Sequence, residues 1–331
     1  MAKTKTTNVK SDIPKEKLLH MHKLMCDIRN FDNKVNQLVR KGQVPGMTHF
    51  SVGEEAANVG AIAAISDGDL ITSNHRGHGQ TIAMEIDLNE MMAEIMGKAT
   101  GTCKGKGGSM HIADLDKGNL GANGIVGGGM GMAIGAALTQ QMKKTGKIVL
   151  CCFGDGAVNE GTFHETLNLA SIWKLPVIFY SINNHYGIST PITSVINVDY
   201  NYRRASAYGV PGHFIEDGND LLAVYKKFQE IVKYVRDGNG PVLVEAMTYR
   251  WYGHSTSDPG KYRTKQEVDD WKKKDPILKY KKSLIDNNLA SEKELDDINQ
   301  KSIDAVEASV QFALESPEPT LESAFTDIFA D

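Results

Sequence analysis

The sequence has few cysteines and no long apolar run. Its 331 residues include four cysteines, at positions 26, 103, 151 and 152. None of them has the C-x-x-C spacing of metal or redox sites, so they are expected to be reduced thiols rather than parts of a disulfide framework. No apolar stretch reaches the roughly 18 residues that span a bilayer. These absences favour a cytoplasmic protein with no membrane segment.

A strong charge of either sign is also missing. The chain has 37 Lys and Arg against 41 Asp and Glu, a formal net charge of −4. This balance gives no electrostatic argument for a nucleic-acid partner. Hydrophobic residues make up 41% of the chain, which is ordinary for a globular protein with a substantial core.

The first 16 residues differ from the rest. They are basic and rich in hydroxyl side chains, as transit peptides are, but they lack arginine and an apolar face. We therefore expect residues 1–16 to form a flexible tail. Length alone suggests about two domains, but one large α/β domain fits equally well. We expect a single domain over residues 17–331 that ends in a helical extension from about 265.

Two short apolar runs, 147–153 and 176–182, have the composition of buried strands. Between them, Phe163, Leu167 and Ala170 recur at helical spacing, and Asn159 is placed to cap that helix. A strand, helix and strand in this order close right-handed with the strands parallel. Asp155 and Asn184 then follow the carboxyl ends of neighbouring strands, where open α/β sheets bind ligands.

The remaining pattern extends this α/β arrangement. Helices are expected from Pro14 to about Gly42, over 54–65 and over 88–98, and a charged helical region over 270–315. A further strand at 213–215 is followed by a helix at 221–235 that Asp220 caps, and then by a strand at 241–247. We predict a doubly wound, mostly parallel sheet with added N- and C-terminal helices.

Glycine is concentrated between positions 97 and 135, where 13 of the 32 glycines lie. Few prolines and serines accompany them, which favours an ordered loop around a ligand over a flexible linker. Gly127, Gly131 and Gly135 are spaced four apart and would share one face of a helix. Close approach of another backbone would compensate their low helix propensity. Either the sheet or a helix of another subunit fits that requirement.

Asp155 and Asn184 together offer a carboxylate and an amide oxygen, which are hard donors suited to Mg²⁺ or Ca²⁺. Two protein oxygens are too few for a complete cage, and Mg²⁺ usually completes its shell with substrate phosphate and water. A bound diphosphate is one interpretation. The other is that both turns merely satisfy strand ends, because Asp-Gly and Asn-rich turns are common.

Five collinear motifs carry a resemblance that favours the first interpretation. They are GDGAVNEG…INN (154–184), SNHRGHG (73–79), GKATGTCKGKGGSMHI (97–112), GANGIVGGG (121–129) and YRWYGHSTSDPGKYRT (249–264). The first resembles the thiamine diphosphate motif. The set, in order from about Lys17 to Pro276, resembles the α subunit of the 2-oxo acid and acetoin dehydrogenase family. The resemblance implies a thiamine diphosphate-binding fold.

The resemblance also implies a set of site residues. It assigns Mg²⁺ to Asp155, Asn184 and the backbone carbonyl of Tyr186. It assigns binding of the diphosphate to Arg76, Gly156 and Ala157. It assigns binding of the aminopyrimidine to Gly124 and Val126, with Ile125 supporting the bent cofactor. It places His254 at the diphosphate end of the cofactor and at the reaction centre, and it identifies His254 and His49 as active-site histidines for proton transfer. Relatives of the pyruvate type usually carry tyrosine before the arginine, so His75 is a departure and an unsettled phosphate contact.

The implied activity is oxidative cleavage of acetoin, with pyruvate decarboxylation as the alternative substrate chemistry. The strings HIADLDKG and GANGIVGGG resemble the acetoin branch more closely. In this family a β subunit completes the active site in an α₂β₂ heterotetramer. A lipoyl domain of a dihydrolipoamide acyltransferase accepts the acetyl-level product.

Two other functions remain as remote alternatives. A nicotinamide-dependent dehydrogenase would use a glycine-rich turn, but the G-x-G-x-x-x-G at 129–135 follows no clear strand and has no acidic residue at the position of that motif. A non-catalytic structural subunit would keep the fold without the chemistry. The joint presence of Asp155, Asn184, Arg76 and His254 argues against it.

Overall fold

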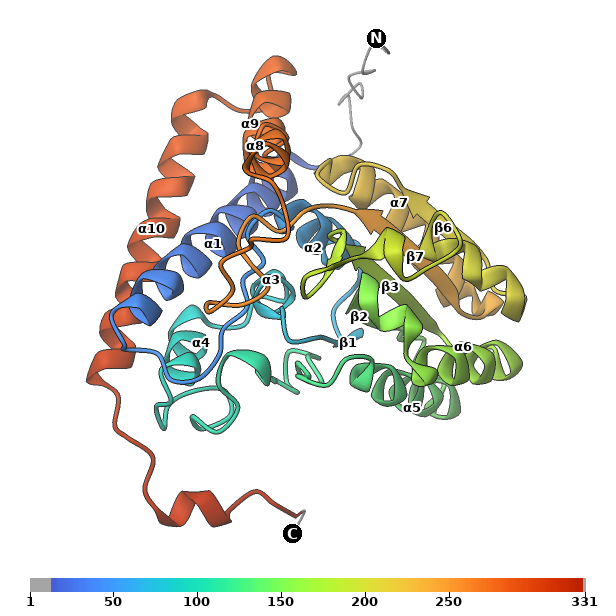
Figure 1. Cartoon of the computed structure of the whole chain (residues 1–331), viewed down its shortest axis with the longest axis horizontal. Coiled ribbons are helices and arrows are strands. Elements are labelled where there is room, and N and C mark those ends of the chain that lie inside the picture. Colours follow the sequence, from blue (N-terminus) through green and yellow to red (C-terminus); the bar gives the residue numbers. More distant parts are fainter. Residues whose placement is uncertain (1–12, 330–331) are drawn as a thin grey trace.

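The computed structural model describes residues 13–329, and its centre is a five-stranded parallel sheet (Figure 1). The strands are β1 (Leu70–Thr72), β2 (Val149–Gly154), β3 (Val177–Asn183), β6 (Gly212–Ile215) and β7 (Val242–Met247). Their order across the sheet is β1-β2-β3-β7-β6, and all four pairings are parallel. A separate antiparallel pair consists of β4 (Tyr186–Gly187) and β5 (Thr190–Pro191).

Helices cover both faces of the sheet (Figure 1). Successive strand residues point to opposite faces, so Leu150 and Cys152 of β2 enter one core while Val149, Cys151 and Phe153 enter the other. The larger core includes α1 (Lys15–Arg40), α2 (Glu55–Ile62) and α7 (Leu221–Tyr234), and the smaller includes α5 (Gly128–Lys143) and α6 (Gly161–Trp173). Burial on both faces explains why these strands are continuously apolar. The α/β architecture expected from the sequence is confirmed.

The helices are α1 (Lys15–Arg40), α2 (Glu55–Ile62), α3 (His78–Ala83), α4 (Leu88–Ile95), α5 (Gly128–Lys143), α6 (Gly161–Trp173), α7 (Leu221–Tyr234), α8 (Lys265–Lys272), α9 (Pro276–Asp286) and α10 (Glu292–Glu315). In Figure 1, α10 runs beside α1 and α4, away from the sheet. The expected helices, and Asp220 as the cap of α7, are present. No helix within residues 13–329 combines the length and apolarity needed to cross a membrane.

Three local expectations need correction or comment. β1 was not expected, because Leu70–Thr72 is too short a run to indicate a strand by its composition. Asn159 does not cap α6: the 3₁₀ turn Asp155–Asn159 comes first, the helix begins after Glu160, and the Asn159 side chain accepts a hydrogen bond from Arg204 (2.8 Å). Residues 1–12 of the expected tail lie outside the described residues, whereas Lys15 and Glu16 belong to α1.

The glycine-rich segment folds around one buried carboxylate. Glu94 of α4 is fully buried and accepts hydrogen bonds from the backbone amides of Cys103, Gly105, Gly107 and Gly108, at 2.7–2.9 Å. A Cβ on Gly107 would lie 2.7 Å from the carbonyl oxygen of His111, closer than real contacts allow. The glycines therefore let the backbone wrap this carboxylate, as an ordered loop requires.

A buried histidine in α1 makes the stability of the fold sensitive to acid. His22 is 1% exposed, and burial lowers its pKa from 6.5 to about 4. The protonated ring is thus disfavoured in the folded chain but not in the unfolded one. The free energy of unfolding is therefore unaffected by His22 protonation above pH 6.5. It decreases as the pH falls from 6.5 towards 4, by about 3 kcal/mol in all.

We expect the His22→Leu variant to lose less of its free energy of unfolding between pH 7 and pH 4.5 than the wild type. Urea titrations at both pH values measure this difference. An exchange at an exposed ring, His20→Leu, is the control. Equal pH dependence in the wild type and the His22→Leu variant would contradict the assignment.

Candidate active site

A cavity of about 240 Å³ opens at the carboxyl edge of β2 and β3. Asp155 and Asn184, each the first residue after its strand, both line it. The predicted meeting of these two residues at one edge of the sheet is confirmed. The other lining residues come from the ends of β2 and β3, from β4, from the 3₁₀ turn after β2 and from loops: Glu54, Asn74, His75, Arg76, Val126, Gly127, Phe153, Gly154, Gly156, Ala157, Glu160, Ile182, Tyr186, Gly187, Ile188, Arg250 and His254.

Asp155 offers an unsatisfied oxygen to this cavity. The residue is 1% exposed, and its Oδ2 atom has no hydrogen-bond partner among the described residues. Burial raises the pKa of the carboxyl from 3.8 to about 6, although Arg250 and Arg76 oppose this shift. A buried carboxylate without a partner is costly unless a cation or donor meets it. The site therefore fits a bound metal ion.

Asn184 is held in one orientation by Glu54. Its Nδ2 donates to Glu54 Oε1 (2.8 Å), and its Oδ1 accepts from the backbone amide of Tyr186 (3.3 Å). The amide nitrogen is thus occupied, which leaves the oxygen as the group available beside Asp155. The carbonyl oxygen of Tyr186 already accepts from Arg250 Nη1 (2.8 Å), so a cation there would share this oxygen with a guanidinium.

Two buried arginines place positive charge at the wall of the cavity. Arg76 donates to the backbone carbonyls of Phe50 (2.7 Å) and His254 (3.1 Å), and its Nε lies 3.8 Å from Glu54 Oε1. Arg250 is 1% exposed and also donates to Tyr262 Oη (2.6 Å). Fixed guanidinium charges at a cavity wall favour an anionic group such as a diphosphate.

Gly156 and Ala157 lie in the 3₁₀ turn that follows β2, and both line the cavity. A Cβ on Gly156 would come within 3.7 Å of Gly187, so the turn passes close to β4. The backbone there is near enough to the cavity to approach a ligand.

The expected pyrimidine-binding residues are only partly brought to the cavity. Val126 lines it, whereas Gly124 and Ile125 do not. Ile125 is 73% exposed, and Gly124 lies beside the ring of His111. The resemblance implied all three at one ligand, and of the three only Val126 lines the cavity.

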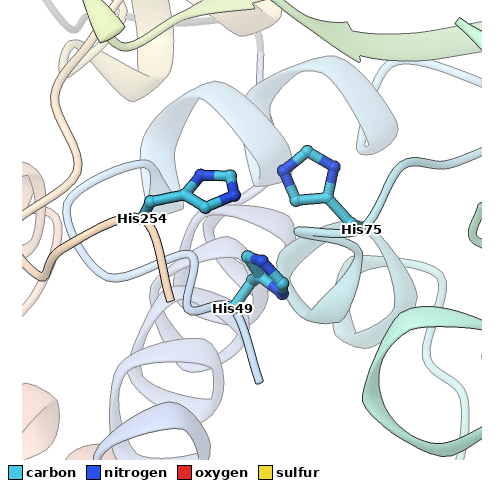
Figure 2. Close-up of side chains that lie close together, drawn as sticks. All are labelled: His49, His75 and His254. Carbon is cyan, nitrogen blue, oxygen red and sulfur yellow. The ribbon is translucent and has the colours of Figure 1, made fainter. Parts of the chain in front are cut away.

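The three expected histidines lie together, as Figure 2 shows. The ring of His49 is 4.8 Å from those of both His75 and His254, and the latter two are 5.3 Å apart. His49 is buried behind the other two and does not line the cavity itself. Burial and, after it, the charge of Arg76 lower the pKa values of His49, His75 and His254 to about 2, 3 and 4.

Glu54 was not expected at the site from the sequence, and no role was expected for Arg250. Burial raises the pKa of Glu54 to about 7, even though Arg76 and Asn184 lower it. A signal for Arg250 was available, because it follows the carboxyl end of β7, the strand next to β3. Glu54 comes from the loop before α2, and its approach to β3 depends on tertiary packing.

The chain matches the dehydrogenase E1 component family over residues 22–322. It is 50% identical over 318 residues to the α subunit of acetoin:2,6-dichlorophenolindophenol oxidoreductase of Bacillus subtilis, and 42% identical over 318 residues to that of Cupriavidus necator. Each alignment covers 96% of this chain and 95% of the relative. The α subunit of pyruvate dehydrogenase E1 from Porphyra purpurea is 38% identical over 327 residues, with 97% and 95% covered.

Proposed function

Because the chain belongs to the dehydrogenase E1 component family, we propose that it is the α subunit of a thiamine diphosphate-dependent enzyme that cleaves acetoin oxidatively. The observation that carries this choice is the higher identity to the two acetoin oxidoreductase subunits than to the pyruvate dehydrogenase subunit over nearly the same span. Pyruvate remains the second candidate substrate, since that relative also aligns along almost the whole chain.

The cavity fits the metal and diphosphate that this function needs. Asp155, Asn184 and the Tyr186 carbonyl would hold Mg²⁺, with the orphaned Oδ2 of Asp155 as the principal ligand. Arg76, Gly156 and Ala157 would hold the diphosphate, and the site proposal extends to Arg250 because its charge faces the same cavity. Thiamine diphosphate, when bound, supplies the electron sink for breaking the bond beside a carbonyl.

The chain's own contribution to proton transfer would come from His254 and His49. Both rings are neutral near pH 7 and have a nitrogen without a partner among the described residues, but their low pKa values make them weak bases while the charge of Arg76 lies beside them uncompensated. Two guanidinium charges help to hold the pKa of His254 at about 4. A diphosphate bound to Arg76 would offset that charge and raise this pKa towards neutrality. Half-buried His75 lies at the same wall, and its contact with phosphate stays a proposal.

A partner subunit would complete the site. Gly131 and Gly135 of α5 have open space where a Cβ would stand, and Ile125, Met132 and Met142 are exposed beside or along the same helix. The open space at these glycines supports the packing of a helix from a β subunit against this face of α5, rather than the packing of the sheet against it. We propose an α₂β₂ assembly that passes its acetyl-level product to a lipoyl domain of an acyltransferase. The single domain, with the α8–α10 region as its extension, belongs to the same proposal.

The test is dye reduction by this chain co-purified with its β subunit, with thiamine diphosphate and Mg²⁺ present. Acetoin and pyruvate are compared at equal concentrations. Faster turnover of acetoin is the expected result. Faster turnover of pyruvate would overturn the substrate while retaining the family. If neither is turned over although thiamine diphosphate binds, the subunit is non-catalytic.

A further inference from the structure

The three clustered histidines come from three separate segments of the chain. His49 precedes α2, His75 follows β1, and His254 lies in the loop after β7. Their rings converge on one point, as Figure 2 shows. One ligand nitrogen from each lies within 4.8 Å of the other two. Around a tetrahedral zinc ion, ligand nitrogens are about 3.3 Å apart. Small ring rotations would therefore bring all three nitrogens within bonding distance of one ion.

The nitrogens of this cluster are available for binding. Nδ1 of both His49 and His254 is buried without a hydrogen-bond partner among the described residues. Since the rings are neutral at pH 7, each keeps one nitrogen whose lone pair carries no proton. The unpaired nitrogens are therefore buried polar atoms that lack a hydrogen-bond or metal partner, as Asp155 Oδ2 is.

We propose that His49, His75 and His254 form a nitrogen-donor site for a divalent transition metal ion such as Zn²⁺. Imidazole suits zinc, copper and nickel, whereas Mg²⁺ prefers the oxygens of Asp155 and Asn184. His75 and His254 line the cavity, so the fourth coordination position faces it and is open to water. The charges of Arg76 and Arg250 oppose a cation, and binding is therefore weaker than at a dedicated zinc site.

This site has a consequence for the enzyme. A metal ion bound there would immobilise His49 and His254 and occupy the nitrogens that the proposed proton transfers need. Zinc would then inhibit reversibly, and a chelator would restore activity. Binding itself does not depend on the substrate, because the three rings are close together whichever compound is cleaved.

The experiment titrates Co²⁺ into the assembled α/β complex, with thiamine diphosphate and excess Mg²⁺ present. Tetrahedral Co²⁺ absorbs visible light strongly, and we expect one equivalent to give these bands and Zn²⁺ to displace them. His75→Phe and His254→Phe each keep a flat ring but remove a ligand, and they should weaken binding by at least about tenfold. The matched control is His213→Phe, a half-buried ring on β6 outside the cluster.

Failure of the wild type to produce these bands would overturn the proposal, as would bands that persist unchanged in both variants. X-ray absorption of the zinc-loaded wild type gives a measurement that needs no variant. Three imidazole ligands are expected, and a shell of oxygen or sulfur ligands would overturn the assignment. Both readouts remain informative if acetoin is not the substrate.

Discussion

Replacement of Asp155 by asparagine is expected to weaken metal-dependent cofactor binding by more than about 100-fold. Loss of a group that only orients a metal ligand already costs about 10–100-fold in affinity, and Asp155 is a proposed ligand itself. The variant removes the negative charge from an oxygen that is 1% exposed and has no partner within the described residues. Calorimetric titration of thiamine diphosphate into the α/β complex, with Mn²⁺ in place of Mg²⁺, measures the loss.

The stability of the Asp155→Asn variant separates this effect from unfolding. Burial raises the pKa of Asp155 to about 6, so its charge costs folding free energy above that pH. Without cofactor, the variant should therefore be at least as stable as the wild type at pH 8. Asp217→Asn, at a carboxylate exposed beside Lys279, is the control. Unchanged binding in the Asp155→Asn variant would remove this residue from the metal site.

Glu54→Leu is expected to reduce metal and cofactor binding by about 10–100-fold, although Glu54 is not a proposed ligand. Its carboxylate holds the amide of Asn184 (2.8 Å) and lies 3.8 Å from the guanidinium of Arg76. Leucine leaves the Asn184 nitrogen without an acceptor, so the amide can turn its oxygen away from the cavity. It also removes a negative charge that balances a buried arginine.

Glu54→Gln provides the matched comparison, because a glutamine oxygen can still accept from Asn184. We expect the glutamine variant to bind Mn²⁺ more tightly than the leucine variant and less tightly than the wild type. Electron paramagnetic resonance of free Mn²⁺ gives these affinities directly. Equal affinity in all three proteins would show that Asn184 does not need Glu54 for its orientation.

Local sequence patterns were sufficient for most of the sheet. β2, β3 and β7 are buried on both faces and are therefore continuous apolar runs, which can be recognised without knowledge of their neighbours. β1 has only three residues, and its pairing with β2 depends on the surrounding packing. The prediction that Asn159 caps α6 was wrong, because the 3₁₀ turn that ends at Asn159 precedes the helix and Glu160 lies between them.

The sequence by itself determined the strand-helix-strand unit and, through parallel strand direction, the meeting of Asp155 and Asn184 at one edge. That inference needs only chain order and the right-handed crossover. Only the tertiary structure decided that Glu54 orients Asn184, that two buried arginines line the same cavity, and that His49 lies against His75 and His254 at its wall. These residues lie on loops far apart in the sequence, and the packing of α1, α2 and α7 against the sheet, which no local pattern encodes, brings those loops together.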